Sequence, residues 1–304
     1  MKVAVTGSSG LIGTALTASL LADGHEVVRL VRRPPRGAGE VRWDPRAADG
    51  GIAGPGAAGL AGIEACVHLA AAGVADRRWT ARRKAEIRAS RVIATRALAV
   101  ALARLSPRPA VLLAASAIGW YGDTGGREVD EQAPAAASGF LPKLVRDWEA
   151  AADPAREAGI RVVHLRSGFV LGRGGILGRL GPLARFGICP RFGSGRQVMS
   201  WISMADEIGA IRFLLASDGS DGAFNLTAPA PATNSQFTAA LLGVFGRPDL
   251  PWFRIPAPLL RLALGEMSSE LLTSARVAPA RLLAAGYQFR YPELRGALAA
   301  ATGR

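Results

Sequence analysis

The hydrophobic and polar positions at the amino terminus predict a strand, a turn, a helix and a second strand in succession. Residues 2–6 form a short apolar and β-branched run, and a glycine-rich turn over 7–13 follows without a linker. From 11 to 21 the apolar side chains recur at the three- and four-residue spacing of a helix, and a polar stop precedes the next apolar run, 27–31. This order is the opening unit of a dinucleotide-binding fold.

The glycines of the turn each meet a separate need of a phosphate-binding loop. Gly7 permits a tight turn off the strand, Gly10 lets the backbone approach a pyrophosphate, and Gly13 lets the helix pack close to the sheet. The alternative is a purely structural turn, since the chain has 37 glycines. The position of the motif between a strand and a helix favours the nucleotide site. The cofactor-binding residues predicted here are Gly7, Ser9, Gly10, Leu11, Ile12 and Gly13.

The end of the second strand predicts NADP(H) in preference to NAD(H). An NAD site usually places an acidic residue there to hold the ribose 2′-hydroxyl, whereas a 2′-phosphate is bound by a guanidinium. Here Arg32 and Arg33 follow the strand, and no Asp or Glu occurs before Glu40. Arg32 is the first choice for the 2′-phosphate and Arg33 the second. The competing interpretation is a general richness in arginine.

Later apolar runs predict further strands that are buried on both faces of a parallel sheet. They cover 63–71, 110–116, 160–166 and 224–227, and they alternate with helical stretches. The pattern predicts an α/β, Rossmann-like, doubly wound parallel sheet. Because ligands of such sheets bind at the carboxyl ends of the strands, Leu69, Ala70 and Ala71 are predicted to lie beside the cofactor. His68, inside the apolar run, is predicted to be a core histidine.

Composition and chain length limit the class of protein. With 304 residues and 49% hydrophobic side chains, the chain can bury a large core. A cluster of prolines after 245 predicts a cofactor-binding domain over 1–245 and a small, mostly helical C-terminal domain over 246–304. No apolar run reaches the length of a membrane span and no leader precedes the first strand, so we expect a cytoplasmic protein without membrane contact. Two distant cysteines and three scattered histidines predict neither a disulfide nor a metal site.

The net charge of +13 raises the question of nucleic acid. Only three lysines are present, however, and the arginines are spread along the whole chain instead of forming one patch. We therefore expect a small-molecule substrate as the partner and no nucleic acid, with a homodimer as the expected assembly if the chain is not a monomer.

Two hydroxyl-bearing residues are the predicted catalytic groups. Ser116 ends a buried strand, and Tyr121 follows in a glycine-punctuated loop, which places both at the nicotinamide end of a cofactor; Ser116 is a cofactor contact as well. Further along, the glycine-rich segment 173–195 carries four arginines and predicts a mobile cap over a pocket that attracts an anion. The predicted substrate-binding residues are Trp79, Arg196, Gln197 and Trp201.

These motifs resemble a known family. The spacing of the three turn glycines, the strand that ends at 68–71, and Ser116 before Tyr121 resemble the extended branch of the short-chain dehydrogenase/reductase superfamily, which holds sugar-nucleotide epimerases and dehydratases. The chain is more similar still to an atypical, epimerase-family or cell-division-inhibitor-like subgroup. The stretches that carry this closer resemblance are 78–80, 116–123, 193–202 and 225–229.

The chain departs from the superfamily at the proton relay. Active members carry a tyrosine with a lysine four residues later, and the lysine lowers the pKa of the phenol. Over 138–149 no tyrosine is present, and Leu141 and Val145 occupy the two places if Glu149 matches the helix glutamate of the family. Tyr121 is followed four residues on by a glycine, so it does not rebuild the pair.

Two routes for a proton remain, and each competes with a structural role. The donor is Ser116 or Tyr121, or else a carboxylate of Asp123 or Glu128 serves. Alternatively, the tyrosine is a packing residue and the carboxylates belong to a solvated loop. Two functions follow: an NADP(H)-dependent oxidoreductase or epimerase-like enzyme for a small substrate, and a non-catalytic NADP(H)-binding sensor or regulatory module.

Overall fold

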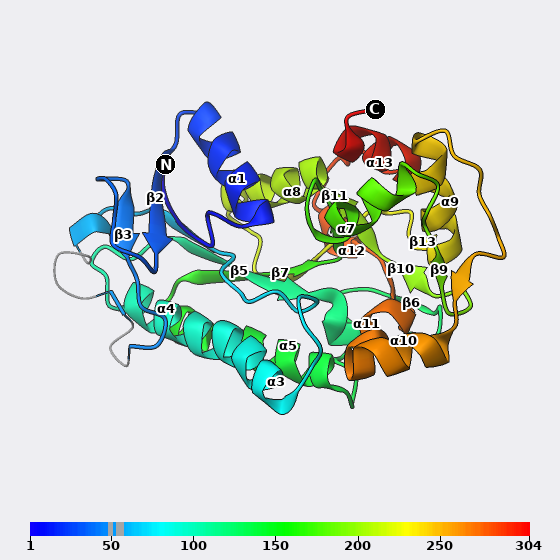
Figure 1. Ribbon diagram of the computed structural model, residues 1–304. Coiled ribbons are helices and arrows are strands. Elements are labelled where there is room, and N and C mark those ends of the chain that lie inside the picture. Colours follow the sequence, from blue (N-terminus) through cyan, green and yellow to red (C-terminus); the bar gives the residue numbers. More distant parts are fainter. Residues whose placement is uncertain (48–50, 53–57) are drawn as a thin grey trace.

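The central sheet of the computed structural model, which describes residues 1–47, 51–52 and 58–304, has seven strands in the order β12-β7-β5-β4-β1-β2-β3. All neighbouring pairs are parallel, as predicted for a doubly wound sheet (Figure 1). In chain order the strands are β1 (Lys2–Thr6), β2 (Glu26–Val31), β3 (Glu40–Arg42), β4 (Ala65–His68), β5 (Val111–Ala117), β7 (Arg161–Ser167) and β12 (Gly222–Leu226).

Helices cover both faces of this sheet, so its central strands are buried on both faces. The helices α1 (Leu11–Ala22) and α8 (Met204–Ala216) pack on one face, and α4 (Ala94–Ala103) and α6 (Asp153–Glu157) on the other, beside α5 (Phe140–Ala150) (Figure 1). Successive strand residues point to opposite faces. In β5, for example, Leu113 belongs to one core cluster and Leu112 to the other. This two-sided burial explains why the strands read as continuous apolar runs.

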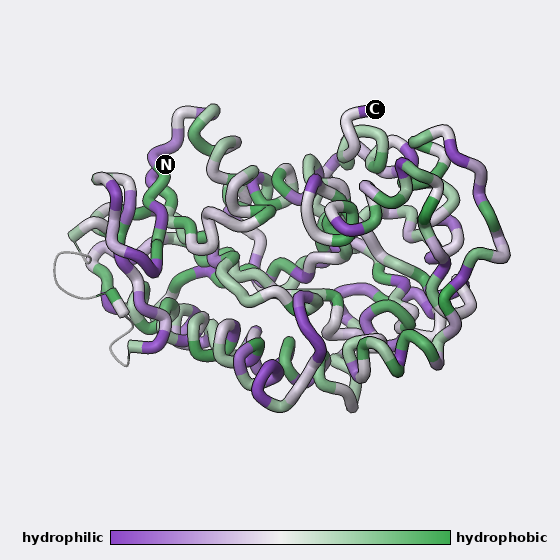
Figure 2. The backbone as a smooth tube through the Cα atoms, viewed as in Figure 1, coloured by the Kyte–Doolittle hydropathy of each residue, from purple (hydrophilic) through white to green (hydrophobic). Residues whose placement is uncertain are grey.

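The helical stretch that precedes β5 is divided into three parts. Thr80 caps α3 (Ala81–Arg88) by accepting a hydrogen bond from the Arg83 amide, a π-helical turn over Ala89–Ile93 follows, and α4 continues the axis. Figure 2 shows α3 as one of the most hydrophilic segments, in agreement with its sequence ARRKAEIR. Helix α6 follows closely after α5, and Pro154 lies in its first turn, where proline is tolerated.

A second group of elements lies beyond the carboxyl edge of the sheet, except α12 (Ala280–Ala284), which packs beside the edge strand β12. The helices are the 3-10 turn η2 (Ile118–Tyr121), α7 (Gly175–Ala184), α9 (Asn234–Val244), α10 (Ala257–Leu264), the 3-10 turn η3 (Gly265–Ser268), α11 (Ser269–Leu272), α12 (Ala280–Ala284) and α13 (Leu294–Thr302). The short paired strands are β6 (Glu128–Val129) with β15 (Arg276–Val277), β8 (Phe169–Leu171) with β11 (Trp201–Ser203), β9 (Arg191–Phe192) with β14 (Arg254–Ile255), and β10 (Val198–Met199) with β13 (Ala232–Thr233).

Contacts from the C-terminal segment reach back to several parts of the chain before residue 246. Helix α13 shares a core cluster with α9, and β15 pairs with β6. The carboxylate of Asp206 accepts hydrogen bonds from the amides of Arg290 and Tyr291 at 2.6 and 3.0 Å. The domain boundary at 246 therefore stays a prediction, and the two parts are joined by many polar contacts.

Two helices begin at a hydroxyl N-cap. Ser203 caps α8 and accepts from the Asp206 amide, while the Asp206 carboxylate accepts from the Ser203 hydroxyl as well as from the C-terminal segment. At α9 the cap is Thr233, with Gln236 completing a capping box. In both helices a hydroxyl outside the apolar pattern takes the cap because its extended backbone aims the oxygen at the free amides.

Candidate functional site

The glycine-rich turn after β1 has the geometry of a phosphate-binding loop. Gly7 adopts φ +68°, which disfavours a side chain, and a Cβ on it would lie 2.8 Å from the Ala70 amide nitrogen. A Cβ on Gly13 would lie 2.1 Å from the carbonyl oxygen of Gly7. The turn is therefore compressed between β4 and the first turn of α1 in a way that only glycine permits at both positions.

The first turn of α1 presents free backbone amides. Gly10 is the N-cap, has an extended backbone, and offers no side-chain hydrogen bond to the amides that follow. Ser9 and Leu11 are exposed beside it, Ile12 is half-buried and Gly13 is buried. Uncapped amides at a helix N-terminus carry partial positive charge and attract a phosphate. The residues therefore fit the pyrophosphate of a dinucleotide.

A series of buried hydrogen bonds through Thr6, His68 and Thr95 supports the backbone next to this turn. The Thr6 hydroxyl accepts from the amides of Leu69 and Ala70 at 3.1 and 3.2 Å, so its own proton is directed to His68 Nδ1 at 2.7 Å. His68 Nε2 in turn contacts the Thr95 hydroxyl at 3.0 Å. Burial lowers the pKa of His68 to about 4, which keeps the ring neutral. This is the core histidine expected from the sequence, and it fixes the backbone where Leu69, Ala70 and Ala71 leave the sheet.

The two arginines after β2 have different surroundings. Arg33 forms a bidentate ion pair with Glu40 through hydrogen bonds of 2.7 and 2.6 Å. Arg32 is exposed and makes no hydrogen bond or ion pair with any residue that the structure describes. The unpaired guanidinium at the carboxyl end of β2 is thus Arg32, the first choice for a 2′-phosphate.

Ser116 and Tyr121 belong to one buried polar network at the ends of β5, β7 and β12. Ser116 donates to Glu149 Oε1 at 2.6 Å, and Arg166 holds the same carboxylate through two hydrogen bonds of 2.8 and 2.9 Å. Arg166 also donates to the Tyr121 oxygen at 3.0 Å, and Tyr121 donates to Asn225 Oδ1 at 2.8 Å. The structure therefore connects the two predicted hydroxyls through Glu149 and Arg166, which sequence reasoning did not assign to the site; nor did it assign Asn225.

The charges of this network fix the direction of its hydrogen bonds. Burial opposes ionisation of Glu149, but the hydrogen bonds from Arg166 and the nearby positive charges outweigh it and leave the pKa below its ordinary value. An ionised carboxylate only accepts, so the Ser116 proton is committed to it. Burial raises the pKa of Tyr121 above its ordinary value, so the phenol stays protonated. Neither hydroxyl holds a spare proton for a substrate in this structure, and their catalytic role stays a prediction.

The positions of the missing Tyr/Lys pair are apolar in space as well as in sequence. Leu141 and Val145 both pack against Gly119. A Cβ added to Gly119 would lie 3.3 Å from Leu141 Cβ and 3.7 Å from a Val145 methyl group. For the alternative carboxylates, a role in proton transfer stays a prediction. Asp123 is exposed and accepts from the Gly125 amide in a local turn, and Glu128 is exposed on β6.

The four predicted substrate-binding residues are placed unequally. Trp201 is fully buried in the core around α9, with its indole bonded to the Ala230 carbonyl, and its role in substrate binding stays a prediction. Gln197 is buried and bonds two backbone carbonyls through its side-chain nitrogen. Trp79 is buried and packs edge-on against Phe140. Arg196 is exposed, and its role in substrate binding stays a prediction.

The predicted cap over 173–195 contains α7. Arg179 from this helix donates to the Ala75 carbonyl at 2.8 Å, and the Leu11 side chain packs against the backbone of 172–175. The segment therefore runs from the phosphate-binding turn to the loop after β4. Arg191, which the sequence suggested as one of its anion-attracting residues, is instead buried and paired with Asp249 at 2.6 Å.

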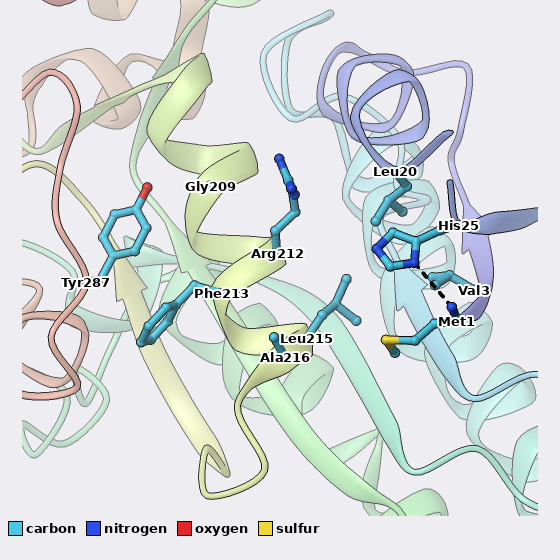
Figure 3. A pocket seen from close by; sticks show the side chains of 10 residues that line it. All are labelled: Met1, Val3, Leu20, His25, Gly209, Arg212, Phe213, Leu215, Ala216 and Tyr287. Carbon is cyan, nitrogen blue, oxygen red and sulfur yellow. Dashed lines mark hydrogen bonds between the residues drawn. The ribbon is translucent and has the colours of Figure 1, made fainter. Parts of the chain in front are cut away.

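The described residues also form a separate apolar pocket of about 470 Å³ between α1 and α8 (Figure 3). It lies at the amino end of the sheet, since Met1, Val3 and His25 line it together with Ala216 at the end of α8. The phosphate-binding turn follows the opposite end of β1, so this pocket is not the nucleotide site. Within the described ranges, no three acidic, cysteine or histidine side chains are grouped as metal ligands, and no helix is long and apolar enough for a bilayer.

The parallel sheet, the glycine turn and the free helix N-terminus define a Rossmann-like dinucleotide-binding protein. Comparison with known families agrees: the NAD dependent epimerase/dehydratase family matches residues 3–227, and a domain of unknown function, DUF1731, matches residues 255–301. The chain belongs to the NAD dependent epimerase/dehydratase family, in its atypical short-chain dehydrogenase/reductase, epimerase-family subgroup, as the sequence motifs predicted.

Individual relatives match the whole chain. Epimerase family protein Mb2239 of Mycobacterium bovis is 44% identical over 304 residues, covering 99% of this chain and 98% of its own. Human epimerase family protein SDR39U1 is 35% identical over 302 residues, covering 98% of each chain. The crystal structure of the human protein with NADPH superposes with a TM-score of 0.89 at 34% identity and covers 100% of both chains. A UDP-N-acetylglucosamine 4-epimerase from Bacillus cereus, 18% identical with a TM-score of 0.77 and covering 99% of this chain and 98% of its own, shares the fold.

Proposed function

We propose that this chain binds NADP(H) and acts as an oxidoreductase or epimerase-like enzyme on a small substrate. The observation that carries the proposal is the combination of uncapped amides at the start of α1 with the unpaired Arg32 at the end of β2. Both are positive and unsatisfied, and both lie at the carboxyl edge of one sheet, where a dinucleotide with a 2′-phosphate requires them. The human relative solved with NADPH supports the same cofactor.

Each group of predicted cofactor-binding residues would contact a different part of NADP(H). The turn from Gly7 to Gly13 would hold the pyrophosphate, and the Arg32 guanidinium would hold the 2′-phosphate. Leu69, Ala70 and Ala71 would lie along the cofactor where β4 ends. The bound nicotinamide supplies hydride chemistry, and the protein orients it and excludes water.

A second function, a non-catalytic NADP(H)-binding module, is favoured by one specific observation. The protons of Ser116 and Tyr121 are both committed inside the protein, to Glu149 and Asn225. A proton relay needs a group that exchanges its proton with the substrate. If the network keeps this arrangement in solution, cofactor binding is retained without turnover.

Calorimetric titration of Arg32→Ala with NADPH and NADH tests the cofactor assignment. We expect NADPH binding to weaken by about 30-fold, in line with the loss of a charge-assisted phosphate contact, and NADH binding to change by less than about three-fold. Arg36→Ala is the matched control, because it removes a neighbouring exposed arginine from the same loop. Equal weakening of the two nucleotides by Arg32→Ala rejects the assignment.

A screen of carbonyl compounds and nucleotide sugars, followed by nicotinamide absorbance, separates the two functions. For an enzyme we expect turnover in the wild type that falls in Ser116→Ala or Tyr121→Phe by about 100-fold, the usual contribution of a proton-transferring group. Tight NADPH binding without turnover in any member of the panel supports the non-catalytic module.

A further inference from the structure

Glu40 is the first acidic residue after the predicted 2′-phosphate site in the sequence, and the sheet fixes its position. It begins β3 and pairs with Arg29 of β2, whereas β2 ends at Val31. At a rise of about 3.3 Å per residue, the Glu40 backbone lies about 7 Å short of the edge at which the nucleotide binds. Its side chain is only 12% exposed.

Arg33 is drawn back from the edge toward this carboxylate. Its two terminal nitrogens reach the two oxygens of Glu40 at 2.7 and 2.6 Å, and the Arg36 amide adds a hydrogen bond at 2.8 Å. The hydrogen bonds from Arg33, followed by that of the Arg36 amide, lower the pKa of Glu40 to about 2, so the carboxylate is ionised at every working pH. The bidentate fork by which a guanidinium grips a carboxylate is also the one by which it grips a phosphate.

We propose that Glu40 is an intramolecular competitor of the 2′-phosphate: it holds Arg33 away from the site and so determines how strongly the protein prefers NADP(H) over NAD(H). This inference rests on the proposed function. Arg32 alone then provides the guanidinium for the phosphate, because Arg33 remains paired with Glu40. The preference for the phosphorylated cofactor is weaker than two adjacent arginines would otherwise give.

The alternative is that the Arg33–Glu40 ion pair is purely structural, a staple that holds together the loop between β2 and β3. Exposed ion pairs contribute little to stability, and Arg33 is 40% exposed in its side chain. The two readings differ in what a neutral residue at 40 does to nucleotide binding. A staple predicts no change or a general loss of affinity, whereas competition predicts a selective gain for NADPH.

The test is calorimetric titration of Glu40→Gln and of the double variant Glu40→Gln/Arg33→Met with NADPH and NADH. Competition predicts that Glu40→Gln tightens NADPH about ten-fold and changes NADH by less than about two-fold. The double variant, which keeps the net charge of the wild type, should return to the wild-type affinity. Glu26→Gln is the control: it removes the same charge from the other end of β2, where Glu26 pairs with Lys2 at 3.2 Å.

Each outcome decides the inference. Unchanged NADPH affinity in Glu40→Gln overturns it in favour of the staple. A double variant that binds NADPH far more weakly than the wild type overturns it too, because Arg33 then already binds the phosphate. An equal gain in Glu26→Gln reduces the effect to net charge and rejects the competition. A wild type that takes up no NADPH rejects the proposed function itself and the competition with it, which separates that failure from the other three.

Discussion

The phosphate-binding turn and the Ser116 network lie at the same edge of one sheet, yet they differ in whether their polar groups have hydrogen-bond partners within the protein. At the turn, the first amides of α1 have no capping side chain and Arg32 has no partner among the described residues. In the network, the carboxylate of Glu149 accepts from both Ser116 and Arg166, and each hydroxyl is paired. The turn therefore has polar groups available for a ligand, whereas the hydrogen-bonding groups of the network are paired with one another.

The difference follows from burial. An unsatisfied polar group at a surface is solvated, so leaving it free for a ligand costs little, whereas a buried one costs about 1–3 kcal/mol. Arg166 is 3% exposed and lies 3.9 Å from the centroid of the Trp120 ring, so its charge must be met within the protein. Pairing it with Glu149 joins β7 to α5, at the expense of hydroxyls that a catalytic site would keep available.

Replacement of Glu149 should have the largest effect on this comparison. Glu149→Gln leaves the buried Arg166 charge uncompensated, and we expect a loss of about 3–5 kcal/mol in the free energy of unfolding, measured with urea. Asp147→Asn is the control on the same helix, since its pairs with Arg88 and Lys143 are partly exposed, and it should cost less than about 1 kcal/mol. Similar losses in the two variants would show that the network is not a closed structural unit.

The neutral His68 under the open turn predicts a pH dependence of stability. The unfolded chain takes up a proton at its ordinary pKa of 6.5 and the folded ring only near 4, so between these values the unfolded state binds more protons. Lowering the pH from 6.5 to 4 should therefore remove up to about 3 kcal/mol of stability through this residue. Urea unfolding across that range should show a smaller loss for His68→Gln than for the wild type, and parallel profiles would contradict the assignment.

A methyl group at Gly13 tests the packing of the turn. Gly13→Ala places a Cβ against the Gly7 carbonyl, and we expect a loss of about 2–3 kcal/mol in the free energy of unfolding together with weakened NADPH binding. Gly243→Ala in α9 is the matched helical control. Its Cβ would meet nothing within 4 Å, so helix propensity should make it neutral or stabilising by up to about 1 kcal/mol. A Gly13 variant as stable as this control would show that the turn relaxes easily.

The smallest expected effect comes from the Tyr121 hydroxyl. Tyr121→Phe leaves Asn225 Oδ1 and one Arg166 nitrogen short of a partner, which should cost about 1 kcal/mol of stability without changing NADPH affinity. Tyr291→Phe, whose hydroxyl makes no hydrogen bond within the described part of the chain, should be neutral. A Tyr121 variant that keeps its stability but loses turnover would move this residue from the structural network to the catalytic site.

Much of the fold followed from local patterns. Continuous apolar runs predicted the central strands because a parallel sheet covered on both faces buries every side chain, and the glycine spacing predicted the turn because backbone contacts exclude a Cβ there. The family subgroup was also identified from motifs alone. The Ser116 network gave a weaker signal in the sequence. Arg166 at the end of an apolar strand and Glu149 in a helix are charges in hydrophobic surroundings, which suggests that they pair. The sequence does not show which hydroxyls bind to that pair.

The sequence by itself determined the order of strands and helices, the phosphate-binding turn and the absence of the Tyr/Lys pair, because these depend on residues near one another in the chain. Only the tertiary structure decided which polar groups remain free. The sequence ranked Arg32 before Arg33 without showing how their surroundings differ, and Glu40 separates them because β3 pairs with β2. Ser116 and Tyr121 are bound by Glu149 and Asn225, which come from other parts of the chain. Hydrogen bonds are short-ranged in space, not in sequence, so the availability of a proton or a charge is settled only once distant segments have packed.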